Sequence, residues 1–231
     1  MHKLLTDLVA GIDPNTQAIW AVHPAEVMRN LRESTHELRG LETKLDQIWR
    51  TTLEQFALVT ARSTMRIILQ ESYRDIKYVL SDEEYMDVKN DNLFVQRFIL
   101  KFNAFIGPLK EMMVGANFDQ YLQHALEYLA TDWERAVRLS KFNMLGAFCF
   151  DNDLRVLQQH FALFTDVPLR EKFAQLGYLA DVLTLEKVDD AEDLWFSHAG
   201  TTPGFMSALD FKNLLLNRLD LDREQVEALR L

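Results

Sequence analysis

The chain has 231 residues, and its 25 Lys and Arg against 35 Asp and Glu give a formal net charge of −10. Hydrophobic residues make up 48% and charged residues 26%, proportions typical of a globular protein with a core and not of a disordered chain. Eight glycines and five prolines are too few for the tight turns of a β-sandwich or barrel, and the acidic balance argues against binding of nucleic acid.

The first predicted element is a long helix that begins near Pro24, because proline is tolerated in the first helical turn. Helical character continues to Tyr78, with an interruption around residues 60–64 left open. One face of this helix carries residues at alternating spacings of four and three: Val27, Leu31, Ser34, Leu38, Leu41, Leu45 and Ile48.

A polar, acid-rich stretch follows at residues 81–92, and we predict a solvated loop there, because runs of like charge repel and extend. Aromatic residues from Phe94 to Phe105 then share one helical face, and the pair Gly107 and Pro108 would kink or end this helix.

A second long helix opens after Gly115 and ends before Gly146. We expect Trp133 to be buried, because it lies on a continuous apolar stripe. The stripe consists of Phe118, Leu122, Ala125, Leu129, Trp133 and Ala136.

Shorter helices are predicted in the final third of the chain. Pro168 opens a helix that runs to Leu185 and carries Phe173 on its buried stripe. Ser207 and Asp222 are predicted to cap the last two helices, since each is followed three residues later by Asp or Gln.

No segment shows the alternation typical of a strand, so the predicted fold is all-α. We expect two stacked helical bundles that meet near residues 107–115. Residues 1–114 would form the first bundle, with long helices, and residues 115–231 a C-terminal bundle with shorter helices.

Sequence signatures of catalysis are missing. The sequence contains no glycine-rich phosphate loop and no HExxH pair. The single cysteine, Cys149, lies in an apolar segment, where burial would raise the pKa of its thiol and leave it inert. The longest uninterrupted apolar run has seven residues, against about 20 for a membrane span. We therefore predict no catalytic residue, no cofactor, no metal ligand and no direct membrane insertion.

An acidic run comes directly before two aromatic residues, Trp195 and Phe196. An acidic rim beside exposed aromatics could dock a basic partner helix. The alternative, which we favour, is that both aromatic residues pack beneath the following loop. The candidate partner surface consists of Asp189, Asp190, Glu192, Asp193 and Trp195.

Four segments together resemble the C-terminal region of the family of subunit 4 of the conserved oligomeric Golgi complex. They are NDNLFVQRFIL at residues 90–100, KFNMLGAFCFDNDLRVL at 141–157, PLREKFAQLGYLADVLTLEKV at 168–188 and LDREQVEALRL at 221–231. Each is a helical pattern, and their common order carries the resemblance.

The resemblance implies a non-catalytic subunit of a multisubunit vesicle-tethering complex, in which stacked helical bundles form part of an elongated rod. It implies a peripheral protein of the cytosol and of the cytoplasmic face of the Golgi membrane. Its expected partners are the other subunits of the complex and Golgi SNAREs, and its expected role is retrograde transport and SNARE-mediated fusion. A subunit of a different helical-rod tether such as the exocyst, and an all-α enzyme with an acidic site, stay open as alternatives.

The resemblance also implies an ion pair between two helices of the final third. The family's arginine position is Gln175 in this chain, and the acidic position matches Asp210. A neutral amide cannot form the charge-assisted pair, so apolar contact would have to supply most of the docking of the terminal helices.

Overall fold

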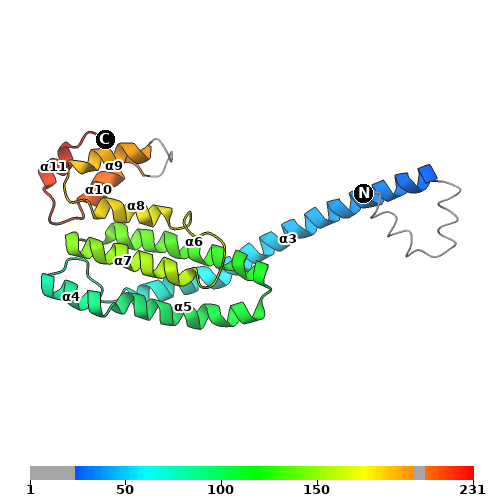
Figure 1. Ribbon diagram of the computed structural model, residues 1–231, viewed down its shortest axis with the longest axis horizontal. Coiled ribbons are helices and arrows are strands. Elements are labelled where there is room, and N and C mark those ends of the chain that lie inside the picture. Colours follow the sequence, from blue (N-terminus) through cyan, green and yellow to red (C-terminus); the bar gives the residue numbers. More distant parts are fainter. Residues whose placement is uncertain (1–23, 200–205) are drawn as a thin grey trace. The chain divides into compact units, whose positions relative to one another are not determined.

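The computed structural model describes residues 24–199 and 206–231. Its contacts divide the chain into two units, residues 1–52 and 53–231, each described by itself. Within the described residues the fold is all-α, as predicted, and the β-type pairing consists of two isolated bridges. The helices (Figure 1) are α3 (Pro24–Ser72), α4 (Asp82–Asn90), α5 (Leu93–Met112), α6 (Gly115–Leu139), α7 (Met144–Phe161), α8 (Ala174–Leu183), α9 (Asp190–Ala199), α10 (Ala208–Leu215) and α11 (Arg223–Ala228).

The second unit is a helical bundle with an aromatic core. Figure 1 shows α6 and α7 in the middle of the bundle, with α5 along one side of this pair and α8 along the other. Trp133 of α6 is fully buried at the centre, and its indole N–H donates to the Tyr73 hydroxyl at 2.9 Å. Phe94 of α5 and Phe150 of α7 lie against it, with ring centroids 5.6 and 5.8 Å from the indole. Further buried rings extend the core from Phe94: Phe98, Phe102 and Phe161.

Both core residues predicted from the stripes are buried. Trp133 is 0% exposed and Phe173 is 1% exposed, and the Phe173 ring stacks on Phe161 with centroids 5.6 Å apart. Phe173 therefore joins the start of α8 to the end of α7.

Phe173→Ala is expected to lower the free energy of unfolding by about 3–5 kcal/mol, because it removes the stacked ring and leaves a cavity. Chemical denaturation measures this loss. The control is Phe196→Ala, at a ring that is 60% exposed, which should change stability by less than about 0.5 kcal/mol. Equal effects of the two variants would contradict the packing of Phe173.

The loop predicted for residues 81–92 is wrong, because this segment contains α4. Ser81 and Glu84 form a complete capping box: the Glu84 N–H donates to the Ser81 hydroxyl at 3.2 Å, and the Ser81 N–H donates to the Glu84 carboxylate at 2.8 Å. The acidic first turn also suits the positive end of the helix dipole. Tyr85 and Val88 pack against the core, which holds α4 on the bundle.

The helix predicted from Pro168 to Leu185 is shorter than expected. Residues 170–173 form a turn, in which the Lys172 N–H donates to the Leu169 carbonyl at 3.0 Å, and α8 begins at Ala174. Leu169 and Phe173 are still buried, although both precede the first residue of α8.

Other boundaries differ in part from those predicted: α3 ends at Ser72 and not at Tyr78. No interruption occurs at residues 60–64, where the Thr60 and Thr64 hydroxyls donate to carbonyls four residues earlier and keep their polar groups within α3. The helix α5 continues past Pro108 to Met112. Ser207 and Asp222 cap α10 and α11, as predicted.

Candidate functional site

The short segment between α6 and α7, residues 140–143, lies between two other parts of the chain. The Phe142 N–H donates to the Asn217 carbonyl at 2.9 Å, and the Leu219 N–H donates to the Phe142 carbonyl at 2.8 Å. On the other side, the Asn143 N–H donates to the Tyr78 carbonyl at 2.9 Å. We call residues 140–143 the strap, because they join the segment after α3 to the segment after α10.

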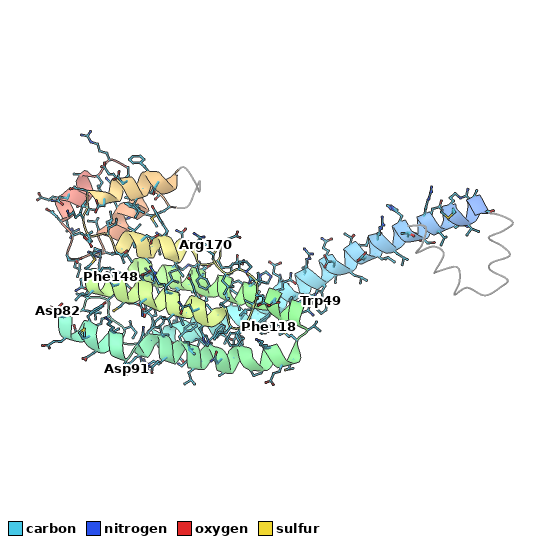
Figure 2. The ribbon with its side chains drawn as sticks, in the orientation of Figure 1. Trp49, Asp82, Asp91, Phe118, Phe148 and Arg170 are labelled. Atoms are coloured by element: carbon cyan, nitrogen blue, oxygen red, sulfur yellow. The ribbon has the colours of Figure 1, made fainter. Side chains whose placement is uncertain are left out.

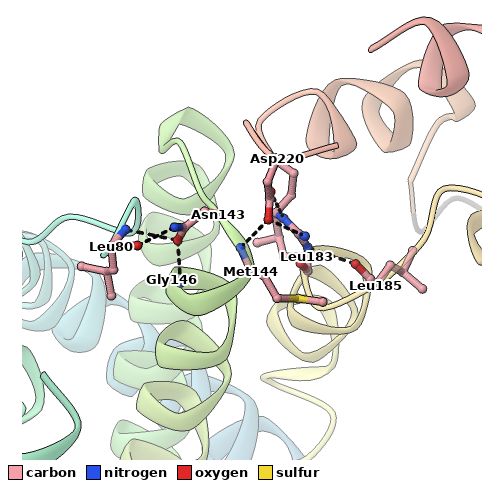
Figure 3. A network of polar contacts seen from close by, with 8 residues as sticks. Leu80, Asn143, Met144, Gly146, Leu183, Leu185 and Asp220 are labelled. Atoms are coloured by element: carbon pink, nitrogen blue, oxygen red, sulfur yellow. Dashed lines mark hydrogen bonds and ion pairs between the residues drawn. The ribbon is translucent and has the colours of Figure 1, made fainter. Parts of the chain in front are cut away.

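Asn143 ties the strap to its neighbour through its side chain (Figure 3). Its amide oxygen accepts from the Leu80 N–H at 3.2 Å, and its amide nitrogen donates to the Leu80 carbonyl at 2.6 Å. The same oxygen accepts from the Gly146 N–H at 3.0 Å, which caps α7. A Cβ atom at Gly146 would lie 1.7 Å from the Tyr78 carbonyl oxygen, so this close approach requires glycine.

Arg218 is a buried cation on the other side of the strap. It is 3% exposed, and its guanidinium forms a two-pronged ion pair with Asp220, at 2.7 and 3.1 Å. It also donates to the carbonyls of Leu183 and Leu185, the latter at 3.1 Å, at the end of α8. Asp220 in turn accepts from the Met144 N–H at 2.8 Å (Figure 3).

These contacts make Asp220 a stable anion. Burial alone would raise the pKa of its carboxyl, but the hydrogen bonds from Arg218 and from the Met144 N–H outweigh burial and hold the pKa below its ordinary value. Arg218 and Asp220 therefore join the start of α7, the end of α8 and the turn after α10.

Nothing in the local sequence singles out Arg218. The resemblance places the family's interhelix pair at Gln175 and Asp210, where a neutral amide replaces the arginine. Gln175 is half-buried in the first turn of α8. Asp210 is exposed in α10, where its carboxylate accepts from the Ser207 hydroxyl at 2.7 Å. A contact between Gln175 and Asp210 stays a prediction.

The acidic partner surface lies at the start of α9. Asp189, Asp190 and Asp193 are exposed. Glu192 is half-buried, and its carboxylate accepts from the Arg230 N–H at 2.9 Å. The surface therefore combines three solvated carboxylates with one that helps to hold the chain terminus.

The two aromatic residues of α9 face different surroundings. The Trp195 ring packs edge-on against Phe211 of α10, with centroids 5.2 Å apart, while Phe196 is 60% exposed. Trp195 is half-buried, so it combines packing with an accessible edge. The use of this surface by a partner stays a prediction.

Asp153 is a buried carboxyl beside a pocket of about 290 Å³. It accepts hydrogen bonds from the Tyr78 hydroxyl, at 3.1 Å, and from the Asn92 side chain. Burial raises its pKa to about 7, and it raises the pKa of Cys149, which lines the same pocket, to about 11. The pKa of Tyr78 is also raised by burial.

Burial thus favours the neutral thiol of Cys149 and the neutral phenol of Tyr78, which disfavours a thiolate nucleophile in this pocket. Within the described residues, no group of three potential ligands is placed to hold a metal ion, and no helix is long and apolar enough to cross a membrane. The buried polar groups serve as ties between segments.

Comparison with known proteins gives the family. The family model described as "Conserved oligomeric Golgi complex subunit 4, C-terminal" matches residues 1–210. The chain belongs to this family. It is 28% identical over 212 residues to "Conserved oligomeric Golgi complex subunit 4" of Arabidopsis thaliana, a match that covers 91% of this chain and 28% of the relative.

Proteins with the same name in other organisms agree. The Homo sapiens protein is 28% identical over 160 residues, covering 69% of this chain and 20% of the relative, and the Dictyostelium discoideum protein is 24% identical over 156 residues, covering 67% and 17%. The chain spans less than a third of the length of these relatives. The family match contains the strap and Gly146, while Arg218 and Asp220 lie beyond its last residue.

Stability is expected to depend on pH through Asp153. In the unfolded chain its carboxyl has an ordinary pKa of about 4, so between about pH 4 and pH 7 the folded protein retains a proton that the unfolded chain has lost. A rise in pH through this window therefore favours unfolding.

Asp153→Asn removes this titration. As pH rises from 4 to 7, the variant should lose less stability than the parent protein, as measured by denaturant unfolding at each pH. Asp166→Asn, at an exposed carboxyl, should follow the parent curve. Parallel curves for the parent and Asp153→Asn would contradict the raised pKa.

Proposed function

We propose that this chain is part of a non-catalytic subunit of the conserved oligomeric Golgi complex, which supports retrograde vesicle transport within the Golgi and SNARE-mediated fusion through protein–protein contact. The family match carries this proposal. It favours this tether over the exocyst and over an enzyme with an acidic site. The proposed location is peripheral, at the cytoplasmic face of the Golgi membrane and in the cytosol.

The polar contacts support a role in binding over a role in catalysis. The Asn143 side chain bonds to backbone groups, and Arg218 and Asp220 bond to each other and to backbone groups, which ties three segments of the chain together. The solvated charges of α9 remain accessible. A rigid bundle that presents charged surface is suited to hold partners in a fixed geometry.

We propose that the partner surface at α9 contacts a basic segment of a sister subunit or of a Golgi SNARE. The exposed carboxylates of Asp189, Asp190 and Asp193 would attract such a segment, and the exposed ring of Phe196 would provide apolar contact beside them.

The experiment is a binding series with the purified chain immobilised and each recombinant sister subunit or Golgi SNARE in solution. At least one of them should bind with a dissociation constant in the micromolar range or below. Absence of binding by every one of them would contradict the proposed partnership.

Two charge variants then test the surface. Replacing Asp189, Asp190 and Asp193 together by Asn should weaken binding by about tenfold or more at physiological salt, because close charge pairs contribute both to affinity and to association rate. The matched control replaces Asp82, Glu83 and Asp87, three exposed acids of α4, by their amides and should leave binding unchanged. If the α9 and α4 variants weaken binding equally, the proposed contact at α9 is wrong, while the proposed partnership stands.

A further inference from the structure

The N-terminal half of α3 carries an apolar face that is open to solvent. Every described side chain from residue 25 to residue 52 is exposed or half-buried. Five large apolar residues on this segment are 50–65% exposed: Leu38, Leu41, Leu45, Ile48 and Trp49. Figure 2 shows the labelled Trp49 on this helix. Apolar side chains gathered on one exposed face mark a site of interaction.

The spacing of this face identifies another α-helix as the group that covers it. From residue 27 to residue 48 the stripe alternates between steps of four and three, which is the heptad period of a coiled coil. We call the stripe the seam. In heptad terms Leu31, Leu38 and Leu45 occupy position a, while position d holds Val27, Ser34, Leu41 and Ile48.

Charges beside the seam disfavour a parallel pair of identical helices. In a parallel coiled coil, position g of one helix faces position e of the next heptad on the other. Glu37 holds a g position and Glu42 the following e position. A parallel dimer in register would therefore place two glutamates opposite each other on both sides, which is destabilising.

An antiparallel pair is electrostatically complementary. In that arrangement g faces g and e faces e. When Leu38 packs opposite Leu41 of the second copy, Glu37 lies opposite Lys44 of the second copy on both sides. Along the e positions, Trp49 lies opposite Met28 of the second copy, a favourable contact between sulfur and an aromatic ring.

Only one antiparallel heptad register places Glu37 opposite Lys44 of the second copy. A shift by one heptad in one direction places Lys44 opposite Lys44 of the second copy, and a shift in the other direction places Glu37 opposite Glu37. The charges therefore select the register in which the leucines at the centre, Leu38 and Leu41, meet across the two-fold axis.

We propose that the seam binds the seam of a second copy of this chain as an antiparallel coiled coil centred between Leu38 and Leu41. This pairing covers the leucines that α3 exposes and places Glu37 of each copy beside Lys44 of the other, so that their charges attract. It is independent of the proposed partners and of the surface at α9.

Molecular mass in solution is the first test. The chain should be dimeric in analytical ultracentrifugation at tens of micromolar, and Leu41→Asp should make it monomeric, because the charge would be buried in the seam. The matched control, Leu100→Asp, changes a leucine of α5 that is 72% exposed and off the seam, and it should remain dimeric. A monomeric parent chain, or a dimer that survives Leu41→Asp, would overturn the proposal.

A charge exchange tests the orientation. Glu37→Lys alone should raise the dimer dissociation constant by about tenfold, because two attractive pairs become repulsive. Adding Lys44→Glu should restore the parent value, because the charges at positions 37 and 44 are then exchanged and again attract each other across the dimer. If Glu37→Lys instead tightens the dimer, the helices are parallel, because the new lysine would face Glu42, and the antiparallel pairing is wrong.

Discussion

Gly146→Ala is expected to destabilise the bundle by about 3–5 kcal/mol. The added methyl would overlap the Tyr78 carbonyl, which lies 1.7 Å from the Cβ position. To make room, the first turn of α7 must move away from the segment after α3, which breaks the hydrogen bond from Asn143 to Tyr78. Urea unfolding of the variant and the parent measures the loss.

Gly177→Ala is the control for this substitution. Gly177 lies inside α8, and a Cβ atom there meets nothing within 4 Å. Alanine is a better helix former than glycine, so this variant should gain about 0.5–1 kcal/mol. If both variants change stability in the same direction and by similar amounts, the close approach at Gly146 is wrong.

Arg218→Ala is expected to cost about 3–5 kcal/mol, since loss of one member of a buried ion pair leaves the other groups unsatisfied. Asp220 would lose both of its contacts with the guanidinium, and the carbonyls of Leu183 and Leu185 would lose their donor. The turn after α10 would then detach from α8, and thermal unfolding should become less cooperative.

Two further arginine variants test whether the buried ion pair causes this loss of stability. Arg218→Lys should recover only part of the loss, because an ammonium cannot reproduce the planar, two-pronged pairing. Arg155→Ala removes an exposed ion pair with Asp151, in which the Arg155 side chain is 69% exposed, and should change stability by less than about 0.5 kcal/mol. A mild effect of Arg218→Ala would contradict its role as a tie.

The helices of the bundle were predictable where hydrophobic period and caps agree. Trp133 lies on a continuous stripe and is fully buried, and Ser207 and Asp222 begin their helices as their side chains indicate. The helix α4 is not predicted from net charge, because its run of acidic residues favours a solvated loop. The Ser81-x-x-Glu84 spacing of a capping box is present in the sequence and favours the helix that forms.

The strap could not be predicted, because nothing in its local sequence indicates its partners. Asn143 bonds to a residue 63 positions away, and Lys141 bonds to one 76 positions away. Arg218 likewise has the local sequence of a solvated arginine, and only the end of α8 makes it a buried one. Contacts between distant segments depend on tertiary packing and leave no periodic pattern.

The contacts of the strap hold the second unit in a fixed geometry, which is consistent with membership of a family of complex subunits. Its polar residues bond the strap to both neighbouring segments, and the carboxylates of Asp189, Asp190 and Asp193 are exposed. A bundle fixed in this way would present α9 in a constant orientation, which a subunit that acts through contacts requires. The surface at α9 and the two-bundle division at residues 107–115 stay proposals.

Amide hydrogen exchange tests the strap most directly. The Phe142 and Leu219 amides, which bond to Asn217 and Phe142 across the strap, should exchange as slowly as the core amides of α6, because both can open only when the bundle unfolds globally. If the Leu219 amide instead exchanges orders of magnitude faster than those of α6, the terminal segment opens independently and the strap does not hold it.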